Sequence, residues 1–286
     1  GYRVDYGHDM NGDGENDLLI GAMGESTNGA SAGAVYLMLG PVTSSTDVSH
    51  ASVRLMGVAG DRAGVAVATV GDTDGDGLSD VAIGADRADQ GGNAAGTVFV
   101  VGGALSGDLY LQDVAPARYG AEAKEHLGAA VAAAGDLDGD GYEDVLVGGP
   151  GWIESGFAGA GAVYVVHGPV TGVDGVATSP EQLRGADSMD SFGFAVGLAG
   201  DLNGDGEPDI AVGAPGADAA YVFYGPLLGT RGADDADLTL HGEAGDGTGS
   251  SVAGVGDVSE DEFDDLLIGA PRSANGTTWI VTGGGL

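Results

Sequence analysis

Short apolar runs and glycine-rich polar stretches alternate along the whole chain at a nearly constant period. Each period contains a run of about six residues rich in Val, Ile and Leu, and these runs begin at Asp17, Asp80, Asp144, Asp209 and Asp265. A second run, β-branched and aromatic, follows a glycine-rich loop and begins at Ala34, Thr97, Ala162, Ala219 and Thr277. Runs this short that close on glycine predict buried strands rather than helices.

Two weaker runs complete each period. A stretch of Gly, Ala, Ser and Val precedes the first apolar run at 63–71, 128–135, 193–200 and 249–256, and 1–7 fits this pattern less well. A fourth run ends at Gly57, Gly185 and Gly242, whereas its counterpart between Leu109 and Tyr119 is blurred. Four short strands in each repeat of roughly 60 residues, with no amphipathic helix, predict blades of a β-propeller, whose innermost strands have room only for small side chains.

The predicted fold is therefore an all-β, five-bladed propeller that forms a single domain over 1–286, with four strands in each blade. The blades are expected at about 1–57, 58–120, 121–185, 186–242 and 243–286, and the last blade is short by its outer strand. Either the five blades close into a disc, or the chain is part of a longer propeller. We favour the closed disc, because a missing sector would expose strand edges to aggregation.

An acidic motif of nine residues lies directly before each first apolar run, in the predicted connection between the first and second strands. The pattern Asp-x-(Asp/Asn/Ser)-x-Asp-x-x-x-Asp begins at Asp9, Asp72, Asp136, Asp201 and Asp257. Side-chain oxygens at positions 1, 3, 5 and 9 of a tight turn converge on one centre, which suits the flexible oxygen coordination of Ca²⁺ better than that of Mg²⁺. An EF-hand is excluded, because position 12 is Ile or Val within a predicted strand instead of Glu.

Four of these loops are predicted to be strong calcium sites, and glycine at position 6 permits their sharp turn. Their candidate ligands are Asp9, Asn11, Asp13 and Asp17; Asp72, Asp74, Asp76 and Asp80; Asp136, Asp138, Asp140 and Asp144; and Asp201, Asn203, Asp205 and Asp209. The fifth loop keeps Asp257, Asp261 and Asp265, but it has Ser259 at position 3 and Glu262 in place of the glycine. We expect a weaker, degenerate site there.

Several of these residues together resemble a known family. Phe192-Gly193 precedes a small-residue strand, the acidic motif follows at 201–209, and Gly-Ala-Pro occurs at 213–215 and again at 269–271. The chain is similar to the FG-GAP repeats of integrin α-subunit propellers and their bacterial relatives, although integrin propellers have seven blades. The resemblance implies Ca²⁺ in the acidic loop and ligand contacts on the opposite face. It also implies that the position 7 carbonyl completes the metal shell, at Glu15, Leu78, Tyr142, Glu207 and Phe263.

Composition narrows the choice of partners and location. The chain has 44 Asp and Glu against 9 Lys and Arg, a formal charge of -35, which excludes binding to nucleic acid or to an anionic membrane and favours a monomer. Its apolar runs fall short of the ~20 residues that membrane insertion requires. The chain has no cysteine and opens on Gly1 without a signal sequence. We read it as a processed or excised region of an extracellular or cell-surface protein.

The sequence offers little support for catalysis. Residues 29–33 match G-x-S-x-G, but no helix follows the serine as the hydrolase motif requires. The five histidines are scattered and are expected to be loop or strand-end residues rather than zinc ligands: His8, His50, His126, His167 and His241. Opposed carboxylates for glycoside hydrolysis cannot be recognised among so many acids. We predict that the chain is not an enzyme.

A partner surface is expected on the face opposite the acidic loops. The long loop at 149–160 carries Trp152, Glu154 and Phe157, and Arg87 and Arg272 are expected to join it. Exposed aromatic residues are typical binding anchors, but Trp152 packed over the neighbouring blade is an equal alternative. The predicted function is a calcium-stabilised, non-catalytic binding or adhesion module for a protein or glycan ligand. The alternatives are an accessory or catalytic propeller of a secreted carbohydrate-active or hydrolytic enzyme, and a structural spacer.

Overall fold

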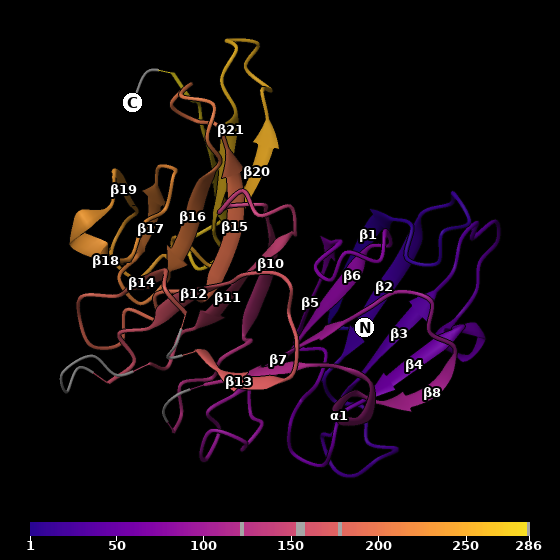
Figure 1. The fold of residues 1–286 in the computed structure, drawn as a ribbon. Helices are drawn as coiled ribbons and strands as arrows, with labels where there is room; N and C mark the ends of the chain where they lie inside the picture. Colours follow the sequence, from indigo (N-terminus) through magenta and orange to yellow (C-terminus); the bar gives the residue numbers. More distant parts are fainter. Residues whose placement is uncertain (121–122, 153–157, 177–178, 285–286) are drawn as a thin grey trace. The chain divides into compact units, whose positions relative to one another are not determined.

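The computed structural model describes residues 1–120, 123–152, 158–176 and 179–284, and these residues are almost entirely strands and turns (Figure 1). The chain divides into two compact units. The first contains Gly1–Val145 and Val166–Thr178, and the second contains Leu146–Val165 and Ser179–Leu286. Within the described residues, no helix has the length and apolar character needed to cross a bilayer.

The first unit holds two sheets that follow the predicted repeat. One has the order β1-β2-β3-β4-β8, with bounds Arg3–His8, Asp17–Ala22, Ala34–Met38, Val53–Met56 and Gly107–Tyr110. The other has the order β13-β9-β7-β6-β5; in chain order its strands are β5 (Ala66–Gly71), β6 (Asp80–Ala85), β7 (Thr97–Val101), β9 (Ala117–Tyr119) and β13 (Val173–Gly175). β10 (Ala130–Gly135) and the short helix α1 (Leu111–Val114) also belong to this unit. The blurred fourth strand is thus β9, displaced toward the end of its segment by β8 and α1.

The second unit holds most of the later strands. β11 (Asp144–Gly149) contains one boundary between the units, and Val166, the last residue of the next strand, lies beyond another. β12 (Ala162–Val166) pairs with β14 (Gln182–Arg184), which pairs with β18 (Thr230–Gly232). A four-stranded sheet contains β15 (Ala195–Gly200), β16 (Asp209–Ala214), β17 (Ala219–Phe223) and β19 (Leu238–His241). The last sheet contains β20 (Ser251–Gly256), β21 (Asp265–Ala270) and β22 (Thr277–Val281). It has three strands among the described residues, as the sequence predicts for the final repeat.

Three sheets contain a fifth strand that the sequence pattern does not predict. β8, β13 and β18 each lie parallel to the fourth strand of a sheet, on β4, β9 and β14 respectively. Each of these added strands comes from the repeat that follows along the chain. Two of the three are only three residues long and the third has four, so they carry no alternation by which a sequence pattern could reveal them. The added strands tie one repeat to the next.

Glycines of the repeat allow close backbone packing between consecutive repeats. A Cβ on Gly84 of β6 would lie 1.9 Å from the carbonyl oxygen of Gly128, and a Cβ on Gly213 of β16 would lie 1.9 Å from that of Gly249. No side chain fits at such distances, which explains why glycine recurs at these places. Phe192 is fully buried and packs edge-to-face on Phe223, with ring centroids 6.2 Å apart.

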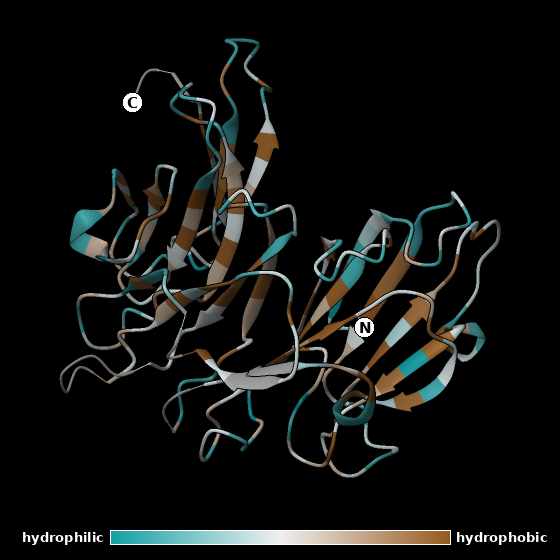
Figure 2. Ribbon diagram, viewed as in Figure 1, coloured by the Kyte–Doolittle hydropathy of each residue, from teal (hydrophilic) through white to brown (hydrophobic). Residues whose placement is uncertain are grey.

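The second and third strands of the first four repeats supply most of the buried apolar surface, whereas β22 of the last repeat is largely exposed. Every residue of β6, β7, β16 and β17 is buried. Figure 2 shows these strands mainly in hydrophobic colours and the connecting turns mainly in hydrophilic ones. The five acidic motifs lie in the connections where each first strand turns into the second.

Candidate metal centres

Each acidic motif forms the turn between the first and second strands of its repeat, as predicted. The carboxylate at position 1 accepts hydrogen bonds from the backbone N–H groups later in the turn. In the first loop Asp9 accepts from Gly12 at 2.7 Å and from Gly14 at 2.7 Å. In the second loop Asp72 accepts from Gly75 at 2.6 Å and from Gly77 at 2.9 Å. The third and fourth loops repeat this arrangement on Asp136 and Asp201.

The aspartate at position 9 begins the second strand and is buried in every loop, at no more than 1% exposed. One of its oxygens accepts the backbone N–H of position 2, at 2.9 Å for Asp17 and 2.8 Å for Asp144. In four loops the other oxygen accepts the N–H of a glycine that follows the third strand, as Gly168 donates to Asp144 at 3.0 Å. A buried charged group with so few partners favours the presence of a counter-cation.

The second loop supports a cation most directly. Asp80 is 1% exposed, and its Oδ1 atom has no hydrogen-bond partner among the described residues. Burial, reinforced by the charges of Asp74 and Asp76, raises the pKa of Asp80 to about 6. Oxygens of Asp72, Asp74 and Asp80 lie within 4.8 Å of one another. A hard divalent cation at this point would receive several oxygen ligands and relieve the repulsion among them, so the residues fit Ca²⁺.

The fifth loop adopts the same turn with less suitable residues. At position 6 the first four loops have glycine at φ between 86° and 94°, and Glu262 takes φ 76° in their place. Glu260 at position 4 has φ 61°, where the other loops again have glycine. Side chains are strained in this left-handed region. The expectation of a degenerate site rested on Ser259 and Glu262, and the structure adds Glu260 to the residues that disfavour the turn.

Consecutive loops are connected to each other within each unit. In the first unit, the N–H of Glu143 in the third loop donates to the carbonyl of Asp72 in the second at 3.0 Å. In the second unit, Asp264 donates to the carbonyl of Asp201 at 3.1 Å and accepts the N–H of Asp201 on its Oδ2 at 2.8 Å. A cation that stiffens one loop would therefore also support its neighbour.

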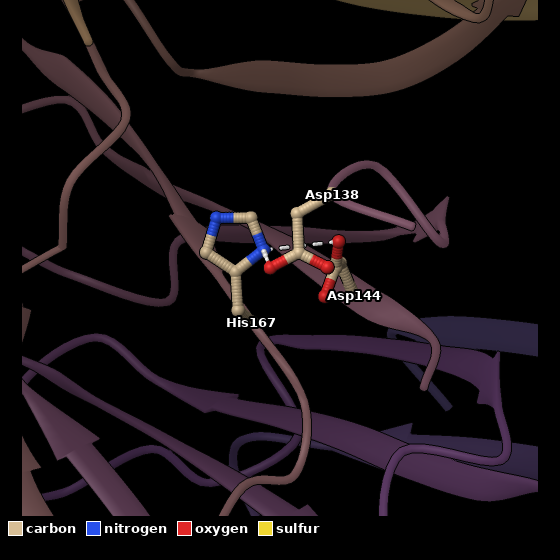
Figure 3. Close-up of side chains that lie close together, drawn as sticks. All are labelled: Asp138, Asp144 and His167. Atoms are coloured by element: carbon tan, nitrogen blue, oxygen red, sulfur yellow. Dashed lines mark ion pairs between the residues drawn. The ribbon is translucent and has the colours of Figure 1, made fainter. Parts of the chain in front are cut away.

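The third loop differs from the others by a histidine. His167 follows β12, and its Nδ1 lies 3.1 Å from Oδ2 of Asp144 and 3.5 Å from Oδ2 of Asp138 (Figure 3). These three side chains form one group whose ligand atoms lie within 4.8 Å of one another. All five histidines were expected to stand apart from any metal, and for His167 the structure shows two loop carboxylates beside the ring. The contact depends on the return of the third strand to the loop, which residue spacing does not reveal.

A second set of acids lies at the other end of the first strands and was missed. These acids stand three residues before a repeated glycine, at Asp61, Glu125, Asp190 and Asp246. Asp61 is 7% exposed, and burial, with a contribution from the charge of Asp89, raises its pKa to about 6. The spacing of an acid three residues before glycine was the available signal. The burial of Asp61, Glu125 and Asp246 could not be read from the sequence.

The predicted partner-binding residues differ in exposure and location. Trp152 is 8% exposed, and the guanidinium of Arg184 lies 4.9 Å from its ring centroid, so Trp152 is packed rather than presented. Packing was one of the two alternatives left open for this residue. Glu154 and Phe157 lie outside the described residues. Arg87 and Arg272 are exposed in the turns after β6 and β21, at the strand ends away from the acidic loops.

Comparison with known proteins identifies the repeat. The FG-GAP repeat profile matches residues 1–38, 63–101, 127–166 and 192–227, more than half of the chain. The fold and its acidic turns thus define an integrin-α-like propeller, and the chain belongs to the FG-GAP repeat family.

Integrin α-subunits are among the relatives with significant similarity. Mouse integrin alpha-3 is 35% identical over 185 residues, which cover 61% of this chain and 16% of the integrin. Chicken integrin alpha-6 is 38% identical over 141 residues, or 47% of this chain and 12% of the integrin. Integrin alpha pat-2 of Caenorhabditis elegans is 41% identical over 119 residues, or 40% of this chain and 9% of the integrin. The chain thus spans less than a fifth of the length of these relatives.

Proposed function

We propose that this chain is a calcium-stabilised, non-catalytic adhesion module that acts outside the cell or at its surface and binds a protein or glycan ligand. The observation that carries the proposal is the acidic turn itself. It occurs five times at the same place in the repeat, with a buried aspartate at position 9 each time. Extracellular fluid supplies Ca²⁺ at the concentrations that extracellular calcium-binding modules require. The family and the integrin relatives support the adhesion class.

The cations have a structural role in this proposal. Five oxygen-rich loops bring many negative charges close together on a chain of charge -35, and bound Ca²⁺ would offset that repulsion. The oxygens of positions 1, 3, 5 and 9 would hold the ion, with the position 7 carbonyl as a further ligand. Because neighbouring loops share backbone hydrogen bonds, binding in one loop would stiffen the next.

We place the ligand at the strand ends away from the acidic loops. In the second unit the turn before β15 presents Met189, which is 74% exposed, and Phe194, which is 43% exposed. Arg272 is exposed in the turn after β21, at the same end of its own hairpin. Exposed apolar side chains and an exposed arginine at this end of the strands suit the recognition of a protein or glycan surface on a chain that is otherwise strongly acidic.

A matched pair of substitutions tests this placement. Met189 and Leu228 are equally exposed, at 74% and 73%, but Leu228 follows β17 at the acidic-loop end of the same sheet. Labelled protein would be applied to arrays of immobilised glycans and purified extracellular proteins, in Ca²⁺ and in chelator. We expect Ca²⁺-dependent binding that Met189→Ser and Arg272→Glu weaken and Leu228→Ser leaves unchanged. If only Leu228→Ser weakens binding, the ligand lies at the acidic-loop end of the sheet and the proposed placement is wrong. Absence of binding on every array would contradict the adhesion proposal.

A further inference from the structure

One position beside the acidic loops changes in chemical character from repeat to repeat. It is the residue directly after the third strand, which lies next to the carboxylates at loop positions 3 and 9. A Cβ on Gly102 of the second repeat, for example, would lie 3.4 Å from Asp74 Oδ2 and 3.6 Å from Asp80 Oδ1. The five residues at this position are Leu39, Gly102, His167, Tyr224 and Thr282. Only the third repeat places a nitrogen ligand there.

The structure holds the three side chains of the third loop in defined positions. Asp144 is fully buried, and its two oxygens accept the N–H groups of Leu137 and Gly168. The Oδ1 atom of Asp138 accepts the N–H of Asp140 at 3.1 Å, which leaves Oδ2 directed to His167. The side chain of His167 is 17% exposed and that of Asp138 is 42% exposed, so Asp138 is the member of the group that is most accessible to solvent.

The separations suit a small divalent transition metal. Two ligand atoms at about 2.1 Å from one metal, at a tetrahedral angle, lie about 3.4 Å from each other, and at a right angle about 3.0 Å. The Nδ1 atom of His167 is 3.1 Å and 3.5 Å from the two carboxylate oxygens. Imidazole nitrogen is a good ligand for zinc and its neighbours, whereas Ca²⁺ takes oxygen ligands. A protonated His167 could lie at the same distances by forming ion pairs with the two carboxylates. Metal titration distinguishes such ion pairs from a metal site.

We propose that the third loop binds a first-row transition-metal dication of the zinc and cobalt class in preference to Ca²⁺, with Asp138, Asp144 and His167 as its ligands. The inference deepens the proposed metal-dependent function, since it rests on the acidic loops being metal sites. It assigns the third loop a metal selectivity that the oxygen-only loops do not have.

The test is a titration of the intact, Ca²⁺-saturated chain with Zn²⁺ at neutral pH, followed by calorimetry and by native mass spectrometry. Ring ¹⁵N spectra would identify the histidine nitrogen that binds. We expect one tight Zn²⁺ per chain and a shifted Nδ1 resonance of His167. His167→Leu, which introduces the residue of the first repeat, should weaken Zn²⁺ binding at least tenfold. His167→Tyr, which introduces that of the fourth, should do the same.

His50→Leu is the control, because His50 also lies beside an aspartate, 3.5 Å from Asp47, but both side chains are at least 70% exposed. This variant should keep the tight Zn²⁺ ion. Equal Zn²⁺ affinity in the wild type and both His167 variants would overturn the inference, as would a wild type that takes up no Zn²⁺ over Ca²⁺. Failure of the calcium proposal would look different: neither the wild type nor any variant would gain stability from Ca²⁺.

Discussion

Replacing Asp80 by asparagine should have opposite effects with and without Ca²⁺. Burial raises the pKa of Asp80 from 3.8 to about 6, and a pKa difference of one corresponds to about 1.4 kcal/mol. A raised pKa means that the folded state favours the protonated form, so at pH 7 the charged carboxylate costs about 3 kcal/mol of stability in the metal-free protein. Asparagine removes that charge and keeps an oxygen to accept the N–H of Thr73.

We expect Asp80→Asn to raise the metal-free stability by about 1 to 2 kcal/mol, since the amide forms an imperfect set of hydrogen bonds in a buried site. Ca²⁺ at about 100 times its Kd would stabilise the wild type by about 2.7 kcal/mol at this loop. The variant loses that gain, so in Ca²⁺ it should be less stable than the wild type by about 1 kcal/mol. The order of the two proteins is therefore expected to reverse.

Urea denaturation at pH 7, in chelator and in Ca²⁺, measures both differences. Asp61→Asn is the matched control, because the pKa of Asp61 is also raised to about 6 by burial but this residue is at the strand end away from the loop. It should stabilise the protein equally in both buffers. An Asp80→Asn effect of the same sign and size with and without Ca²⁺ would refute the reasoning.

Three further outcomes are expected. The stability gained by Asp61→Asn should be complete above about pH 6 and should vanish as the pH falls below 3.8, because the carboxyl is then protonated in both folded and unfolded chains. Denaturation from pH 3.5 to pH 8 would test this, and a stability difference between variant and wild type that stays constant over this range would contradict it. Glu262→Gly should stabilise the metal-free chain by about 1 kcal/mol, because glycine adopts the left-handed φ of 76° without the strain of a side chain. Urea denaturation would measure the change, and a loss of stability would contradict this prediction. Gly102→His should create a second Zn²⁺ site beside Asp74 and Asp80. Native mass spectra that still show a single bound Zn²⁺ would contradict the claim that the residue after the third strand supplies a metal ligand.

The strand order within each repeat was predictable because it depends on local patterns. The apolar runs that begin at Asp17 and Ala34 became the adjacent strands β2 and β3, and the acidic motif before Asp17 became the turn. Small residues and glycine marked the first strands, where the backbones of consecutive repeats approach each other. Whether the five sheets close into one disc stays a prediction. The sequence spacing determines the strands within each repeat, but closure depends on the sum of the angles between successive repeats.

The features that escaped prediction depend on contacts between segments far apart in the chain. β8 pairs with β4, so that Val53 lies opposite Gly107 across a long intervening segment, and β8 has no apolar pattern of its own. His167 meets Asp138 and Asp144 only because β12 ends beside the loop. Such contacts follow from strand register, which a single sequence does not supply.

The most direct test of the central claim is thermal unfolding of the chain in Ca²⁺, in Mg²⁺ and in chelator at matched ionic strength, with bound ions counted by native mass spectrometry. The account predicts a large rise in Tm that is specific to Ca²⁺, with four or five divalent ions bound per chain. An unchanged Tm and a spectrum without bound metal would contradict the assignment of the acidic loops as metal sites.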